Sequence, residues 1–87
     1  MASRARGLSK SVHSAEQLVF RELTVAARKR AGLTQQELAK RLKRPRSFVA
    51  KYEGGERRLD VVEFTAVVQA IGVDPLRVLR SLLQRSS

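Results

Sequence analysis

Residues 33–56 read LTQQELAKRLKRPRSFVAKYEGGE, and this stretch decides the fold. Apolar residues recur in it every three or four positions, in two groups: Leu38, Ala39 and Leu42, then Val49 and Tyr52, with Phe48 beside them. This spacing places each group on one face of an α-helix, with polar and basic residues on the other face. We therefore predict two short amphipathic helices, at about residues 34–42 and 45–53, joined by a tight connection.

Capping signals indicate where the other helices begin and end. A capping box, in which a short polar residue is followed three positions later by Glu or Gln, occurs three times: Ser14 with Gln17, Thr34 with Glu37, and Asp60 with Glu63. Asp74 followed by Pro75 marks one more start, because proline suits the first helical position. Glycines stand after three of the segments: Gly32, Gly54-Gly55 and Gly72. Since no alternating strand pattern occurs, these signals predict an all-α bundle of five short helices, the last at about residues 75–85.

Composition excludes several kinds of site. The 87 residues suit one small domain, which we place at residues 14–87. There is no cysteine and His13 is the only histidine, so the sequence predicts no disulfide, no metal site and no cofactor. No apolar run reaches the ~18 residues of a membrane span, so no membrane partner is expected. Residues 1–13 are basic and rich in serine; we interpret them as a flexible arm, with a transit peptide as the alternative.

The net charge of +10 is concentrated on the two central helices. Residues 28–51 hold nine bases against one acid, Glu37. A basic face on one element is the electrostatic footprint of a protein that binds a polyanion. The alternative, a solvated surface that only confers solubility, usually mixes both signs of charge. The charge distribution therefore favours nucleic acid as the partner.

A helix pair whose second member turns a polar face outward is the helix-turn-helix arrangement, which presents a recognition helix to the DNA major groove. We predict base contacts from four residues of that helix: Arg46, Ser47, Ala50 and Lys51. Arg46 stands near the helix N-terminus and suits guanine O6 and N7, with a phosphate contact as the alternative. Lys51 suits base or phosphate equally, and Ala50 suits a thymine methyl group or simply close approach. Double-stranded DNA is therefore the expected partner.

Two longer motifs connect the chain to a known family. Residues 28–39 follow the pattern R-x-x-x-G-L-T-Q-x-E-L-A, and residues 44–60 follow R-P-x-S-F-V-x-K-Y-E-x-G-E-R-R-L-D. Through these motifs residues 23–73 resemble the Cro/C1-type helix-turn-helix domain of phage repressors and of the bacterial Xre family. The resemblance implies a lambda-repressor-like bundle of five helices. One departure is Lys43, because the family often has glycine in this turn, where a left-handed backbone is wanted.

The resemblance also implies roles for single residues. The glutamine that matches Gln35 grips a phosphate with help from the start of its helix, whereas the alternative role is only to fill a capping position. The arginine that matches Arg28 pairs with the glutamate that matches Glu53, which makes this pair structural. Phosphate contacts are expected from five residues in and around the motif: Thr34, Gln35, Arg44, Arg57 and Arg58. For the three arginines the alternative is a solvated loop. No base, nucleophile or metal ligand accompanies Glu53 or Glu56 in the sequence, so no enzyme is expected.

The last predicted helix has more apolar residues than one core needs. Leu76, Leu79 and Leu83 form one stripe, and Val78 with Leu82 forms a second stripe beside it. We predict a homodimer through residues 73–85, with four leucines at its interface: Leu76, Leu79, Leu82 and Leu83. The alternative is a helix buried broadly in its own core.

Together these features predict a dimeric, sequence-specific repressor of the phage or mobile-element type, which binds an inverted-repeat operator in the bacterial cytoplasm, at the nucleoid. Three variants stay open: a stand-alone repressor, a restriction–modification controller and an antitoxin. The alternative from another class is a protein-interaction module, in which a toxin or an antiactivator binds this surface and DNA is incidental. The basic outer face of residues 45–53 favours DNA, whereas an apolar face would have favoured a protein.

Overall fold

The computed structural model describes residues 14–86, and within this range the chain forms five helices and no strand. The helices are α1 (Ala15–Arg30), α2 (Gln35–Leu42), α3 (Arg46–Glu53), α4 (Val61–Ile71) and α5 (Pro75–Ser86). The predicted all-α bundle of five helices is therefore confirmed. The three helices predicted by residue number each differ from the observed helix by one residue at one end. The predicted arm, residues 1–13, lies outside the described residues.

Helices begin where the sequence provides caps. The Thr34 hydroxyl accepts a hydrogen bond from the Glu37 N–H at 3.0 Å, and the Glu37 carboxylate accepts one from the Thr34 N–H at 2.8 Å. Asp60 and Glu63 form the same reciprocal pair at the start of α4, at 2.7 and 3.0 Å. At the start of α1 the Ser14 hydroxyl accepts from the backbone N–H three residues on, at 3.2 Å. Complete capping boxes therefore open α2 and α4, and a hydroxyl cap opens α1.

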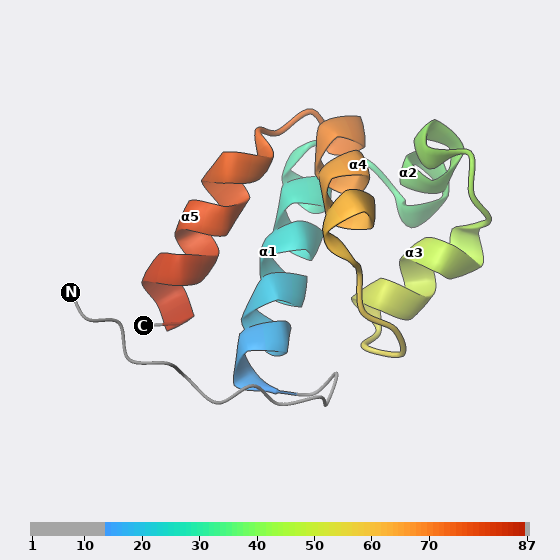
Figure 1. Cartoon of the computed structure of the whole chain (residues 1–87). Coiled ribbons are helices and arrows are strands. Elements are labelled where there is room, and N and C mark those ends of the chain that lie inside the picture. The colour runs from blue at the N-terminus through green and yellow to red at the C-terminus, as the bar shows by residue number, and fades with distance from the viewer. Residues whose placement is uncertain (1–13, 87) are drawn as a thin grey trace.

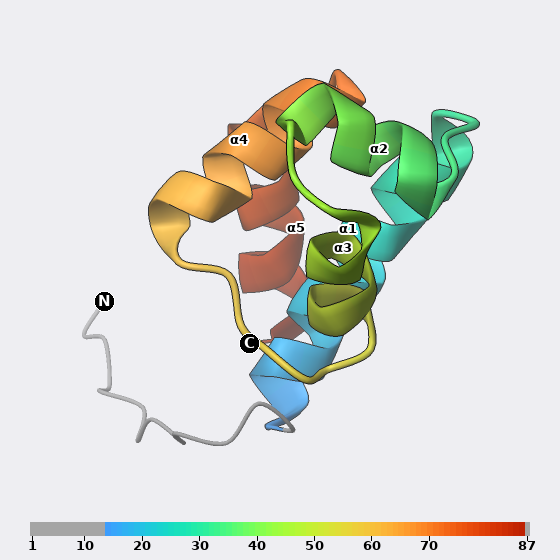
Figure 2. The ribbon, with the colours of Figure 1, turned by 90° about the vertical axis from the view of Figure 1, so that its right-hand side faces the viewer.

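The helix-turn-helix pair and α5 occupy opposite sides of the molecule. Figures 1 and 2 show α1 and α4 between α5 and the α2–α3 pair. Helix α2 packs on α3 and α4, whereas α5 packs on α1 and α4. The main core lies between the first four helices and includes Leu38, Ala39, Val49, Tyr52 and Val67. A second cluster, of Phe64, Val68 and Val78, attaches α5. Because both cores share α4, the position of α3 is fixed relative to the rest of the domain.

The turn between α2 and α3 has a left-handed residue that is not glycine. Lys43 has φ 56° and ψ 41°, and no other non-glycine residue between residues 14 and 86 has a positive φ. The Lys43 N–H donates to the Lys40 carbonyl at 3.1 Å, and the Arg44 N–H donates to the Ala39 carbonyl at 3.0 Å. These bonds end α2 by satisfying its last carbonyls. The chain thus forms the left-handed turn with a lysine, at a cost of about 1–2 kcal/mol for an L residue.

Lys43→Gly is expected to raise the free energy of unfolding by about 0.5–1 kcal/mol, because glycine removes the left-handed strain but loses more entropy on folding. Denaturant unfolding monitored by circular dichroism measures the change. Lys40→Gly is the matched control, since Lys40 is exposed inside α2 and the same substitution there should lower stability by about 1 kcal/mol. Equal destabilisation by both substitutions would contradict the assignment of strain to Lys43.

Candidate nucleic-acid interface

Helix α3 turns one face into the core and the other to solvent. Its inner residues Phe48, Val49 and Tyr52 are buried, whereas Arg46, Ser47 and Lys51 are exposed and Ala50 is half-buried. Pro45 precedes the helix, and no side chain caps its first N–H groups. Between residues 14 and 86 nothing pairs with the guanidinium of Arg46 or the ammonium of Lys51. The residues predicted to contact bases therefore lie together on an outward, basic surface of a helix that the core holds from behind.

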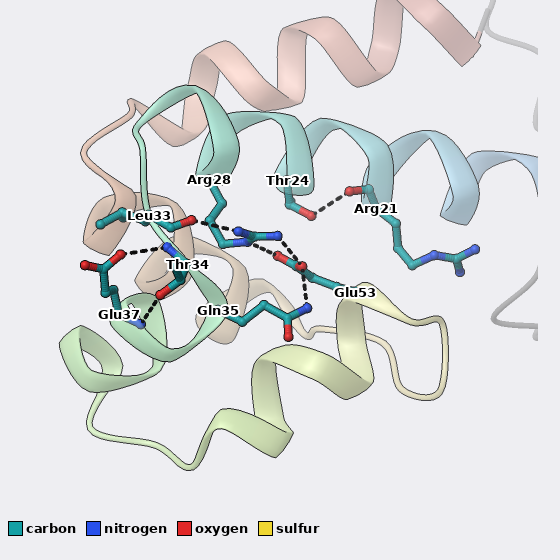
Figure 3. A network of polar contacts seen from close by, with 8 residues as sticks. All are labelled: Arg21, Thr24, Arg28, Leu33, Thr34, Gln35, Glu37 and Glu53. Atoms are coloured by element: carbon teal, nitrogen blue, oxygen red, sulfur yellow. Dashed lines mark hydrogen bonds and ion pairs between the residues drawn. The ribbon is translucent and has the colours of Figure 1, made fainter.

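Helix α3 is tied to α1 by a nearly buried ion pair. Arg28 Nε and Nη2 donate to the two carboxylate oxygens of Glu53 at 2.7 and 2.9 Å, and Arg28 Nη1 donates to the Leu33 carbonyl at 2.7 Å (Figure 3). The side chains of Arg28 and Glu53 are only 10% and 6% exposed. The hydrogen bond to Glu53 raises the pKa of Arg28 above its ordinary value, so the guanidinium stays charged. The pair thus fixes the end of α3 against α1.

Gln35 extends this ion pair to the start of α2. Its amide Nε2 donates to Glu53 Oε1 at 2.9 Å, and the side chain is half-buried (Figure 3). One amide hydrogen therefore remains to reach a phosphate. The neighbouring Thr34 uses its oxygen as an acceptor for the Glu37 N–H, which leaves its own O–H free to donate. The predicted phosphate contacts of Gln35 and Thr34 stay predictions, with donor groups available for both.

Comparisons with known proteins agree with this geometry. A family described as helix-turn-helix domain matches residues 26–83. The chain belongs to this helix-turn-helix family. A solved structure, an XRE-family like protein from Pseudomonas syringae pv. tomato str. DC3000, is similar with 46% sequence identity and a TM-score of 0.81 over 87% of this chain and 93% of that one. No curated protein matches. The predicted Xre resemblance is confirmed, and the chain is a DNA-binding regulator of the XRE type.

Within residues 14–86 none of the helices has the length and hydrophobicity of a membrane span. In the same part of the chain no three His, Cys, Asp or Glu residues gather where they could hold a metal ion.

Phe48 organises two of the arginines predicted to contact phosphate. The guanidinium carbons of Arg44 and Arg57 lie 4.4 and 4.9 Å from the centroid of the Phe48 ring, and Arg57 Nη2 donates to Glu63 at 3.0 Å. The hydrogen bond from Arg57, followed by that from the Asp60 N–H, lowers the pKa of Glu63. Sequence reasoning missed this cluster, because which arginines meet an aromatic ring depends on the path of the α3–α4 loop. Glu63 already holds Arg57, whereas Arg44 and Arg58 remain exposed.

The Tyr52 hydroxyl is buried on the inner side of α3. Tyr52 Oη and Arg57 Nη1 both lie inside the protein, and neither has a hydrogen-bond partner among the described residues. Burial, and then the charge of Glu53, raises the pKa of Tyr52 well above its ordinary value. The phenol is therefore held neutral in the folded protein.

Stability is expected to fall as the pH rises above about 10, by up to ~1.4 kcal/mol per pH unit. Above this pH the unfolded chain releases the Tyr52 proton at its ordinary pKa, whereas the folded protein keeps it, so unfolding becomes more favourable. Below this pH both states keep the proton, and Tyr52 does not make the stability depend on pH. Tyr52 is the only tyrosine, so tyrosinate absorbance reports on it alone. Tyr52→Phe serves as the control and should show a shallower alkaline loss. Tyrosinate forming near pH 10 in the folded protein would contradict the expectation.

Proposed function

We propose that the protein is a dimeric, sequence-specific transcriptional repressor that inserts α3 into the major groove at each half of an inverted-repeat operator, at the nucleoid in the bacterial cytoplasm. The observation that carries the proposal is the outward face of α3. There Arg46, Ser47 and Lys51 are exposed on a helix that the core and the Arg28–Glu53 pair hold rigidly. Base readout requires such a helix, because side chains must stay in register with the base edges.

The surrounding donors suit the DNA backbone. Thr34 and Gln35 begin α2, whose N-terminus attracts a phosphate, and Arg44 and Arg58 are exposed beside α3. Arg57 is the weakest of the predicted phosphate contacts, because Glu63 and Phe48 already hold it. Arg46 is assigned to guanine, and Ala50 permits close approach to the groove.

A second copy of the chain is proposed to cover α5. Leu76 and Leu83 are 63% and 69% exposed, seven residues apart on one side of the helix. Leu79 and Leu82 are half-buried between this side and the core, whereas Val78 is buried. The apolar residues of α5 thus divide differently from the two predicted stripes, since Leu79 turns toward the core and Leu76 does not. A repressor of an inverted repeat needs such a two-fold contact.

DNA binding to the protein's own upstream region, compared with random DNA at two salt concentrations, tests the proposal. We expect a specific complex at least ~10³-fold tighter than the non-specific one. Arg46→Ala should weaken it by about 1–3 kcal/mol and relax the sequence preference. Lys29→Ala, which removes an exposed cation of α1, outside both α3 and α5, is the control and should leave the preference unchanged. Unaltered affinity and preference in both Arg46→Ala and Lys51→Ala would exclude α3 as the reading helix.

The alternative function is a protein-interaction module, such as an antitoxin or the target of an antiactivator. The exposed leucines of α5 would support this alternative if a different protein, rather than a second copy of the chain, covers them. Weak binding of equal strength to both DNAs, fading steeply with salt, would support this alternative over the repressor. Gene neighbourhood would separate the three variants that stay open: a stand-alone repressor, a restriction–modification controller and an antitoxin.

A further inference from the structure

A groove of about 330 Å³ lies between the C-terminal part of α1, the α4–α5 connection and α5. It lies on the side of α1 that faces α5, whereas α3 packs on the other side of α1, as Figure 1 shows for the three helices. Its apolar floor includes Leu23, Ala27, Ile71, Val73 and Val78. Its volume falls within the range of about 300–1,000 Å³ that small-molecule sites occupy, and apolar walls with a few polar groups are typical of such sites.

The polar groups of this groove are basic. Arg30 comes from α1 and Arg77 from α5; both are exposed, and between residues 14 and 86 neither guanidinium group has an ion-paired or hydrogen-bonded partner. Ser81 adds a hydroxyl from α5, and no carboxylate lines the groove. Three other grooves, of about 390, 280 and 100 Å³, each carry at least one carboxylate: Glu22 and Glu53, Glu16 and Asp60, and Glu63. The charge of this groove therefore selects for an anion.

The position of Arg77 strengthens the argument. It lies in the first turn of α5, where the helix dipole disfavours a cation. The acid at this end of the helix, Asp74, precedes the first turn, and its carboxylate accepts from the Leu76 N–H. Arg30, by contrast, is in the last turn of α1, where a cation is ordinarily favourable. Helix stability thus explains the position of Arg30 but not that of Arg77. An anion held between the two guanidinium groups explains both positions.

We propose that this groove binds a small carboxylic acid with an apolar body. The carboxylate lies between Arg30 and Arg77, which can each offer a forked pair of N–H donors, and the Ser81 hydroxyl donates beside them. The body lies over the floor at Leu23 and Val78. A neutral molecule of the same shape loses both charged contacts, and a cation is repelled. The site goes beyond the proposed repressor function and does not depend on it, because binding here involves no residue of α3.

Amide chemical shifts of the full-length protein, titrated with benzoate, indole-3-acetate and octanoate, test the site. We expect saturable shifts at Gly72, Val73 and Ser81 with at least one of the three acids, and none with benzyl alcohol or phenyltrimethylammonium. Arg30→Gln and Arg77→Gln should each weaken binding about tenfold or more. Both residues are exposed, so the variants should fold.

Arg80→Gln is the matched control, since Arg80 is an exposed arginine of α5 that does not line the groove. It should leave the dissociation constant unchanged. The proposal is overturned if none of the three acids binds, if the uncharged alcohol binds as tightly, or if Arg77→Gln and Arg80→Gln have the same effect. DNA binding is not part of this readout, so failure of the site leaves the proposed repressor function untouched.

Discussion

Glu53→Ala is expected to lower the free energy of unfolding by about 3–5 kcal/mol, which is a large part of the stability of a domain this small. Glu53 accepts three hydrogen bonds, two from Arg28 and one from Gln35, at 2.7–2.9 Å. Removing the carboxylate leaves the Arg28 guanidinium inside the protein with only the Leu33 carbonyl as its partner. The cost arises mainly from this stranded charge, rather than from the attraction that is lost.

Thermal and denaturant unfolding measure this effect, and two controls separate its causes. Glu22→Ala removes a carboxylate from an ion pair with Arg85 that is about half exposed, so it should change stability by less than about 1 kcal/mol. The double variant Arg28→Met, Glu53→Leu removes both charges and should be more stable than Glu53→Ala alone. If the double variant were less stable than the single one, charge burial would not be the cause.

The hydrogen bonds around Glu53 and at the helix caps show which parts of the site could be predicted from the sequence and which could not. The caps at Thr34 and Asp60 follow from local sequence, because a capping box involves residues only three positions apart. The pairing of Arg28 with Glu53 spans 25 positions and came from a resemblance, not from spacing. The bond from Gln35 to Glu53 was not predicted, since it depends on how closely α2 approaches the end of α3.

The sequence pattern of α5 did not predict which of its apolar residues the core covers. A stripe of apolar residues predicts that a helix is covered, but the direction of the core decides which residues are covered by the chain itself. Leu76 and Leu79 are three positions apart, yet only Leu79 is turned toward the cluster of Phe64, Val68 and Val78. The prediction of a surplus apolar surface can therefore be narrowed to Leu76 and Leu83, with Leu79 and Leu82 at its edge.

Leu76→Ser combined with Leu83→Ser is expected to convert the proposed dimer into a folded monomer and to weaken operator binding by at least about 100-fold. Each leucine buried at a two-fold interface contributes roughly 1.5–3 kcal/mol, and the double substitution removes four of them. Once the subunits separate, each half-site is bound independently and the gain of about 10²–10⁴ from linked binding is lost. Because both side chains are more than 60% exposed in the monomer, its own stability should hardly change.

Sedimentation and DNA titration measure the two parts of this prediction on the same samples. Leu18→Ser is the matched control, because Leu18 is an exposed leucine on α1, 45% exposed, and the same substitution there should leave the mass and the operator affinity unchanged. A monomer that still binds the full operator tightly would show that α3 reads DNA without a two-fold partner. A dimer that survives the double substitution would place the interface elsewhere. Only one result would show that the apolar side of α5 and the basic face of α3 serve the same function. In that result the double variant loses both the dimer and operator binding, while its circular dichroism stays unchanged.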